Sequence, residues 1–489
     1  MRKLLLIIIF AVTASGVCAQ SFEEYKKRVQ AEYDQYRADR QREFKAYRDR
    51  INAEFADYMR RAWPEYKSRP ADPVPDSPEP PAPVVRDPDA RPSNDPLPFD
   101  RVMPAPAPAP AEPPQPVVPL PRPSKPVRPS FAFTFYGERC GLPLDDSHRF
   151  TLAAIDENRV ADGWRRLSSD DYLPVVAACL DCRTRLRLCD WGYVRFVERM
   201  TEAFLGAARQ NEARLMQMYI LTQSGYKVRI ARADGRLVLL LPSQETIYCY
   251  PYLTIGSLRY YIVDSSVGGQ TSLNVYTREF PNEQLFSLRM DTQPQLPVAP
   301  AAPRTLRSKH DASMTAEVSV NANLMAFYDD YPQSGHWDIY AGASLSERAK
   351  SQLYPVLRRA IAGRDKPTAA NMLLHFVQTA FDYATDEQQF GAERALFADE
   401  TLYYPCSDCE DRAILYSVLV RELLGLDVVL LHYPGHLASA VCFDTEVAGD
   451  HLQVDGRRYV VCDPTYINAN IGEAMPQFKR TAARVVRTK

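Results

Sequence analysis

Aromatic residues recur every eleven positions near the start of the chain. Residues 22–65 form four units, FEEYKKRVQAE, YDQYRADRQRE, FKAYRDRINAE and FADYMRRAWPE, and Tyr66 follows them. Each unit has Phe or Tyr first and Tyr fourth, which places the rings on one face of a helix. An eleven-residue period predicts a nearly straight helix or a right-handed supercoil. We therefore expect a long helix over 20–66, whose aromatic stripe either packs on the rest of the protein or docks a second copy or an envelope partner.

Proline dominates the next segment. Residues 69–130 hold 23 of the 40 prolines of the chain, a density that favours extended polyproline II over a packed core. We assign 67–130 to a Pro-rich linker that holds the helix away from the folded regions. A shorter Pro- and Ala-rich linker at 293–310 separates two folded regions, 131–292 and 311–489.

The second folded region alternates helix-like and strand-like patterns. AANMLLHFVQTAFDYA at 369–384 has the apolar spacing of an amphipathic helix, and a second helix is predicted from Cys409 to about Leu424. Three strand-like runs follow, DVVLLHY, LASAVCF and RRYVVCD. A helix followed by antiparallel strands predicts an α+β fold.

The first folded region repeats this order more weakly. NEARLMQMYILTQSGYKVRIARADGRLVLLL, at 211–241, aligns with 409–441 after one two-residue gap, so that Gly225 meets Gly425 and Gly235 meets Gly435. RYYIVD at 259–264 then lies opposite RRYVVCD at 457–463. The alignment predicts a degenerate copy in which Asn211 and Arg236 stand where the second region has Cys409 and His436. The alternative is that any helix followed by a β-meander gives such a match.

Charge and hydropathy narrow the classes of function. The net charge of −2 supplies no basic field, so we expect no nucleic-acid partner. Residues 1–19 read as a cleaved signal peptide, with a basic start, a short apolar run and small residues near Ala19. Val17 fits poorly before an acylated Cys18, so we predict export to the periplasm or the outside without a lipid anchor.

The cysteines give little indication of a metal site. Ten are present, and nine remain after cleavage, an odd number that implies a free thiol in an exported protein. Cys179, Cys182 and Cys189 lack a fourth ligand at zinc spacing, so a disulfide or buried thiols are the favoured interpretation. Calcium loops and phosphate-binding glycine patterns are absent from the sequence, and we predict no cofactor or metal.

One set of residues has the order that nucleophilic catalysis needs. Cys409 begins a predicted helix, where backbone N–H groups favour a thiolate. His436 opens a strand after YPG, and Asp463 ends the next strong strand. Neighbouring strand ends can bring an imidazole and a carboxylate together, which is what an activated thiol requires. Singly, each residue has an ordinary structural explanation; their order favours a triad.

These residues resemble the transglutaminase-like superfamily of papain-related cysteine enzymes, in the form found in exported Bacteroidota proteins. The resemblance covers about 370–478 and rests on C-x-D-x-A at Cys409, Asp411 and Ala413, on Gly435 and His436, and on Asp463, Pro464 and Thr465. It implies a cysteine-bearing helix against a small antiparallel sheet. It also implies Cys409 as nucleophile, His436 as general acid and base, and Asp463 as the orienting carboxylate.

The resemblance leads to a functional hypothesis with one alternative. We expect an exported cysteine hydrolase, a protease or amidase, that cleaves peptide or isopeptide amides through an acyl-enzyme; an amine in place of water would make it a transamidase. Candidate oxyanion donors are the Cys409 amide with Gln389 or Tyr404. Cys406 is expected to be free or packed rather than paired with Cys409. The alternative is a non-catalytic envelope scaffold with an oligomerising helix.

Overall fold

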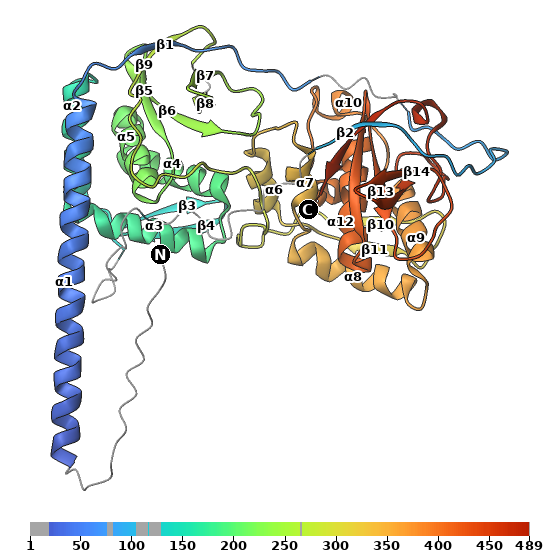
Figure 1. Ribbon diagram of the computed structural model, residues 1–489, viewed down its shortest axis with the longest axis horizontal. Helices are drawn as coiled ribbons and strands as arrows, with labels where there is room; N and C mark the ends of the chain where they lie inside the picture. Colours follow the sequence, from blue (N-terminus) through green and yellow to red (C-terminus); the bar gives the residue numbers. More distant parts are fainter. Residues whose placement is uncertain (1–18, 76–81, 104–115, 117–128, 265–266, 489) are drawn as a thin grey trace.

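A single long helix flanks a two-region body in the computed structural model, which describes residues 19–75, 82–103, 116, 129–264 and 267–488. Helix α1 spans Ala19–Met59 (Figure 1). The predicted signal peptide lies almost wholly outside the described residues. In the part of the chain that the structure describes, no helix combines the length and the apolar character needed to cross a membrane.

The two halves of α1 have different surroundings. From Arg48 onward the stripe packs on the first folded region, where Phe55 is 2% exposed and its ring lies 4.8 Å from that of Trp164. Before this point the helix extends beyond the body, as the lower half of α1 in Figure 1 shows. There Tyr33 and Tyr36 are 55% and 57% exposed. The stripe therefore serves as core in one half and lies uncovered in the other.

The helix is shorter than the repeat predicted. It ends at Met59, and residues Glu65–Lys67 form strand β1 instead of a further helical turn. Pro64 explains the difference, because proline lacks the N–H that a helix needs and disfavours helical backbone in the residue before it. Trp63 donates its indole N–H back to Met59 O at 2.8 Å and closes the helix end.

The first folded region consists of helices followed by a six-stranded sheet of order β1-β9-β5-β6-β8-β7. Short 3-10 helices occupy 146–148, 170–172 and 207–209. The other elements are β3 Phe131–Phe135, β4 Glu138–Leu142, α2 Glu157–Leu167, α3 Leu173–Arg185, α4 Asp190–Leu205, α5 Gln210–Gln223, β5 Arg229–Ala233, β6 Arg236–Ser243, β7 Tyr252–Ile255, β8 Leu258–Ile262 and β9 Ser272–Val275.

The second region carries a sheet with the matching order β2-β16-β12-β13-β15-β14. Its described elements are β2 Phe99–Val102, β10 Arg304–Arg307, β11 Thr315–Val318, α6 Ala322–Asp329, α7 Trp337–Gly342, α8 Glu347–Ile361, α9 Lys366–Thr379, α10 Asp386–Phe390, α11 Ala398–Tyr403, α12 Cys409–Leu424, β12 Asp427–Tyr433, β13 His436–Cys442, β14 His451–Val454, β15 Arg457–Cys462, a 3-10 helix Pro476–Phe478 and β16 Ala483–Arg487. The predicted α+β class is confirmed.

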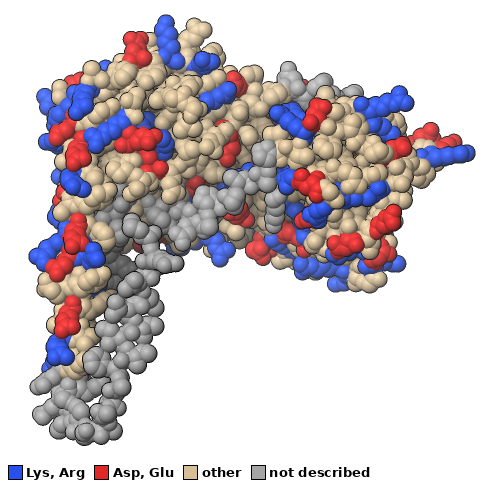
Figure 2. All heavy atoms as spheres, viewed as in Figure 1, with Lys and Arg blue, Asp and Glu red and all other residues tan. Residues whose placement is uncertain are grey.

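The two regions share one apolar core instead of lying apart on a flexible linker. A continuous cluster of buried side chains runs from Ile51 in α1 through both regions to Val486. At the junction the Trp191 indole donates to Asp330 O at 2.9 Å, and the ring of Tyr136 lies 5.6 Å from that of Phe327. The visible surface intersperses acidic and basic side chains, with no field of one sign (Figure 2).

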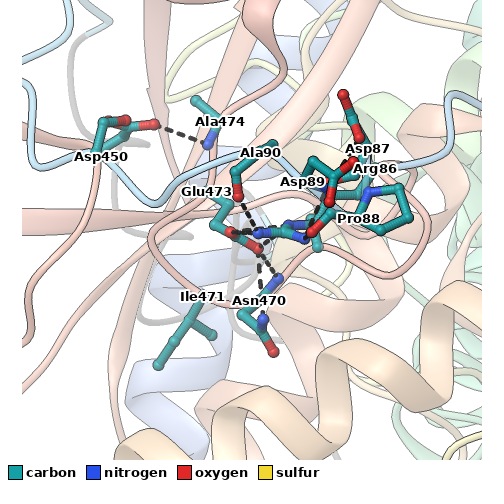
Figure 3. Close-up of polar contacts among 12 residues, drawn as sticks. Arg86, Asp87, Pro88, Asp89, Ala90, Asp450, Asn470, Ile471, Glu473 and Ala474 are labelled. Carbon is teal, nitrogen blue, oxygen red and sulfur yellow. Dashed lines mark hydrogen bonds and ion pairs between the residues drawn. The ribbon is translucent and has the colours of Figure 1, made fainter.

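Part of the predicted Pro-rich spacer is built into the second region. We call residues 82–103 the strap. Its strand β2 pairs parallel with β16, the last strand of the chain, and Leu97 is 5% exposed. Arg86 donates to both carboxylate oxygens of Glu473 and to the carbonyl of Ala90 (Figure 3). The strap thus completes a sheet, whereas proline content alone predicted a semi-rigid spacer that holds the helix away from the folded regions.

Candidate active site

Cys409 is the first residue of α12 and lies almost fully inside the second region. The helix ends at Gly425, whose φ of +64° is the left-handed conformation that glycine adopts without strain. At the other end, Cys409 is 2% exposed, and the first-turn amides of the helix surround its side chain with partial positive charge. The predicted placement of this thiol at a helix start is therefore found in the structure.

Among its contacts, the Cys409 sulfur accepts one hydrogen bond and donates another. The backbone N–H of Leu437, the second residue of β13, donates to Sγ at 3.2 Å. The thiol itself donates to Oε2 of Glu410 at 3.2 Å. The first contact holds the sulfur against the start of β13, at the backbone of the residue that follows His436. The second contact is not evident from the sequence, because an acidic residue in the first turn of a helix ordinarily caps the helix.

His436 is held by the predicted carboxylate. Its Nε2 lies 2.8 Å from Oδ2 of Asp463, and the two residues are 4% and 2% exposed. Asp463 follows β15, which pairs with β13, and its other oxygen accepts the N–H of Thr465 at 3.0 Å. Because a carboxylate accepts from Nε2–H, Nδ1 is the ring nitrogen left to take a proton from a thiol.

The imidazole also has an aromatic neighbour that the sequence did not indicate. The ring of Phe478 lies parallel to that of His436, with 4.8 Å between centroids and 8° between planes. The ring of Phe478 also stacks on that of Tyr433, with 4.8 Å between the ring centroids. Phe478 lies in a 3-10 helix fifteen residues after Asp463, and only the tertiary fold returns it to the histidine.

The two predicted oxyanion partners differ in position. The side-chain carbonyl of Gln389 accepts the N–H of Cys406 at 3.2 Å, which holds its amide group against the segment that leads to Cys409. The Tyr404 hydroxyl donates to Asp329 at 3.3 Å, and its ring meets Phe390 edge-on at 4.9 Å. Gln389 therefore keeps an N–H donor near the nucleophile segment, while the Tyr404 hydroxyl is engaged elsewhere.

A compact group of buried carboxyls lies beside the first turn of α12. One carboxylate oxygen from each of Asp386, Asp408 and Glu410 lies within 4.8 Å of the other two. Asp408 accepts the N–H of Asp386 at 3.1 Å, and Asp386 accepts that of Arg394 at 2.7 Å. These bonds tie α10 to the start of α12, which is a structural role. The nearby Arg412 donates to Ser407 Oγ and to three backbone carbonyls.

All nine described cysteines are free thiols, with different surroundings. Burial raises the pKa of Cys462, next to Asp463, to about 12, which marks an inert sulfur. A hydrogen bond from Cys140, helped by Arg185, lowers the pKa of Cys182 to about 7. The sequence grouped Cys182 with Cys179 and Cys189, but its contact is with Cys140, a residue of β4.

Comparisons with protein-family models, with curated proteins and with solved structures gave no match to this chain. The evidence for a function therefore lies in the arrangement of Cys409, His436 and Asp463.

Proposed function

We propose that the chain is an exported cysteine hydrolase of transglutaminase-like type, acting on peptide or isopeptide amides in the periplasm or outside the cell. The observation that carries the proposal is the contact at the start of β13. Leu437 N–H holds the Cys409 sulfur while the preceding residue, His436, is bound to Asp463. Thiol, imidazole and carboxylate in this order are the parts of an acyl-transfer triad.

The proposed reaction is a sequence of proton transfers between Cys409 and His436, and it requires the thiol to leave its hydrogen bond to Glu410. The thiol proton passes to Nδ1 of His436, and the resulting thiolate attacks the amide carbonyl carbon. The Cys409 N–H and the Gln389 amide supply donors for the oxyanion. The imidazolium then gives its proton to the departing amine, leaving a thioester. His436 next takes a proton from water, whose oxygen attacks the thioester, and the free acid and thiol are restored.

A non-catalytic scaffold is the second candidate, and the burial of the site favours it. Cys409, His436 and Asp463 are each no more than 4% exposed, so a substrate carbonyl needs a local opening to reach the sulfur. The exposed half of the α1 stripe suits a protein that assembles partners. Reactivity of the thiol separates the two candidates.

Alkylation at mildly acidic pH tests the proposal without knowledge of the substrate. Fully reduced full-length protein is treated with iodoacetamide at pH 6, and peptide mapping gives a rate for each cysteine. We expect Cys409 to react at least about tenfold faster than Cys462, and to lose that advantage in His436→Ala. Cys182 serves as a reference, because its lowered pKa arises outside the site. A Cys409 rate equal to that of Cys462 supports the scaffold instead.

The substrate class is then found with the same full-length protein. Envelope extracts are incubated with the wild type and with Cys409→Ala, and newly formed amino groups are compared. New amines that depend on Cys409 indicate hydrolysis, and new crosslinks indicate transamidation. If both samples give identical products, the enzyme assignment fails.

A further inference from the structure

The central strands of the two sheets match in register as well as in order. Arg229 pairs with Leu240, and Val429 pairs with Ala440, at positions 200 residues later in both strands. The next strand continues the match, because Leu240 faces Ile262 where Ala440 faces Val461. Asp264 follows Ile262 by two residues, as Asp463 follows Val461. The structure therefore supports the sequence alignment and extends it to this aspartate.

A side-chain contact is repeated at the same place. Asn211, in the first turn of α5, accepts the backbone N–H of Leu237 on its Oδ1 at 2.8 Å. Cys409, in the first turn of α12, accepts that of Leu437 on Sγ at 3.2 Å. The turns before these strands also agree, with φ of +77° at Gly235 and +67° at Gly435. A helix followed by an arbitrary meander would not reproduce the contact.

We propose that Asn211 and Arg236 form a second ligand site, which binds a carboxylate and performs no catalysis, with Asp264 orienting the guanidinium instead of contacting the ligand. With Oδ1 engaged by Leu237, the side chain of Asn211 offers its NH₂ group to a ligand. Arg236 stands where His436 stands in the second region, and a guanidinium is a donor of five N–H bonds and accepts none. Asp264 stands where Asp463 orients the imidazole.

The chemistry of this set selects the ligand class. An amide and a guanidinium are not nucleophiles, but together they match the two oxygens of a carboxylate. Asn211, Arg236 and Asp264 are all half-buried, in contrast to the buried triad, so a ligand can reach them from solvent. The carboxylate can be the C-terminus of a peptide or an acidic side chain. This inference does not depend on Cys409 being catalytic.

Protection from an arginine reagent tests the site directly. Full-length Cys409→Ala protein is treated with phenylglyoxal in the presence of acetyl-tetraalanine, and modification of Arg236 is followed by peptide mapping. We expect the peptide to slow modification at least about threefold. The same peptide with its C-terminal carboxylate converted to an amide should give no protection. Acetyl-Ala-Glu-Ala-amide tests the acidic side chain as the source. Arg232 in the same hairpin, which pairs with Glu157, is the internal control and should be unaffected.

Two results would overturn the proposal: equal protection by acid and amide peptides, or no protection by any carboxylate peptide. Binding is also measured by titration calorimetry with Arg236→Gln and Arg232→Gln. We expect affinity for acetyl-tetraalanine to fall about tenfold or more only in the first, since charged hydrogen bonds contribute about 1.5–3 kcal/mol. Equal affinity of the two variants also refutes it.

A gain-of-reactivity experiment tests the equivalence of the positions. In Cys409→Ala protein, Asn211→Cys alone introduces a thiol at the first turn of α5. Adding Arg236→His supplies an imidazole beside it, with Asp264 already present. We expect alkylation of the introduced thiol at pH 6 to be at least about tenfold faster when both substitutions are present. Equal rates would show that the two side chains do not meet, and the carboxylate site would lose its structural basis.

Discussion

Replacing Asp463 by asparagine measures what the carboxylate contributes to the proposed reactivity of the Cys409 thiol. The amide is nearly isosteric and can still accept from His436 Nε2–H, so the fold and the ring orientation are retained. What disappears is the negative charge 2.8 Å from the imidazole. The proposed thiolate–imidazolium pair should become less populated, and the thiolate is the species that reacts with an alkylating agent.

The magnitude follows from the burial of the pair. A hydrogen bond to a charged group contributes about 1.5–3 kcal/mol, and a neutral one about 0.5–1.5 kcal/mol. With side chains only 2% and 3% exposed, solvent screening removes little of that difference. A loss of about 1–2 kcal/mol corresponds to a roughly 5- to 30-fold slower reaction. Above about pH 9 the difference should vanish, because an ordinary thiol ionises near pH 8.5 without an imidazolium partner.

The assay is the alkylation rate of Cys409 between pH 5 and 9, read by peptide mapping. Asp444→Asn is the matched control: it removes an exposed carboxylate beyond the far end of β13, where Asp444 pairs with Lys366. Equal rates for Asp463→Asn and wild type over the whole range would refute the reasoning. A uniform slowing that persists at pH 9 would point to altered access instead of lost charge.

Three further predictions concern other parts of the molecule. Phe478→Ala removes the ring stacked on His436. Because such ring contacts contribute about 0.5–1.5 kcal/mol, the alkylation rate of Cys409 should fall roughly 2- to 13-fold. The rate of Phe478→Leu should lie between those of the wild type and Phe478→Ala. Burial raises the pKa of Asp399 to about 6, so the native state binds the carboxyl proton more tightly than the unfolded chain does. The free energy of unfolding should therefore fall by up to about 3 kcal/mol as the pH rises from about 4 to 6. Urea unfolding of Asp399→Asn over the same pH range should not show this fall. If the exposed stripe joins two copies, the double variant Tyr33→Glu and Tyr36→Glu should have a lower mass in sedimentation and an unchanged melting temperature. Phe55→Ala, in the half of the helix that packs on the body, should instead lower the free energy of unfolding by about 3–5 kcal/mol. An unchanged mass in the double variant would contradict self-association.

The elements around the nucleophile were well predicted because their signals are local. The helix from Cys409 to Leu424 was predicted with its observed bounds, and the run DVVLLHY coincides with β12. Capping glycines, apolar periodicity and β-branched residues act over a few positions, so one sequence suffices to read them. The Asp463 contact with His436 was also predictable, since it requires only that two neighbouring strands end together.

The missed features depend on contacts between distant segments. Phe478 reaches His436 only after the loop that follows Asp463 folds back, and no local pattern marks it. An acidic residue in a first helical turn ordinarily caps the helix, yet the Glu410 carboxylate accepts a hydrogen bond from the Cys409 thiol. Residues 99–102 pair with β16 although proline content predicted a spacer between folded regions. In each case the contact depends on tertiary packing, which the local sequence does not reveal.

The parallel pairing of β2 with β16 has a consequence for how the protein is assembled and dissected. The two strands lie far apart in the sequence, so the sheet that carries His436 acquires its outer strand only when both segments are present. A fragment that starts at residue 311 leaves the backbone of β16 open to strand addition by another molecule. Experiments on this protein should therefore keep both segments, and limited proteolysis within the strap is expected to promote aggregation.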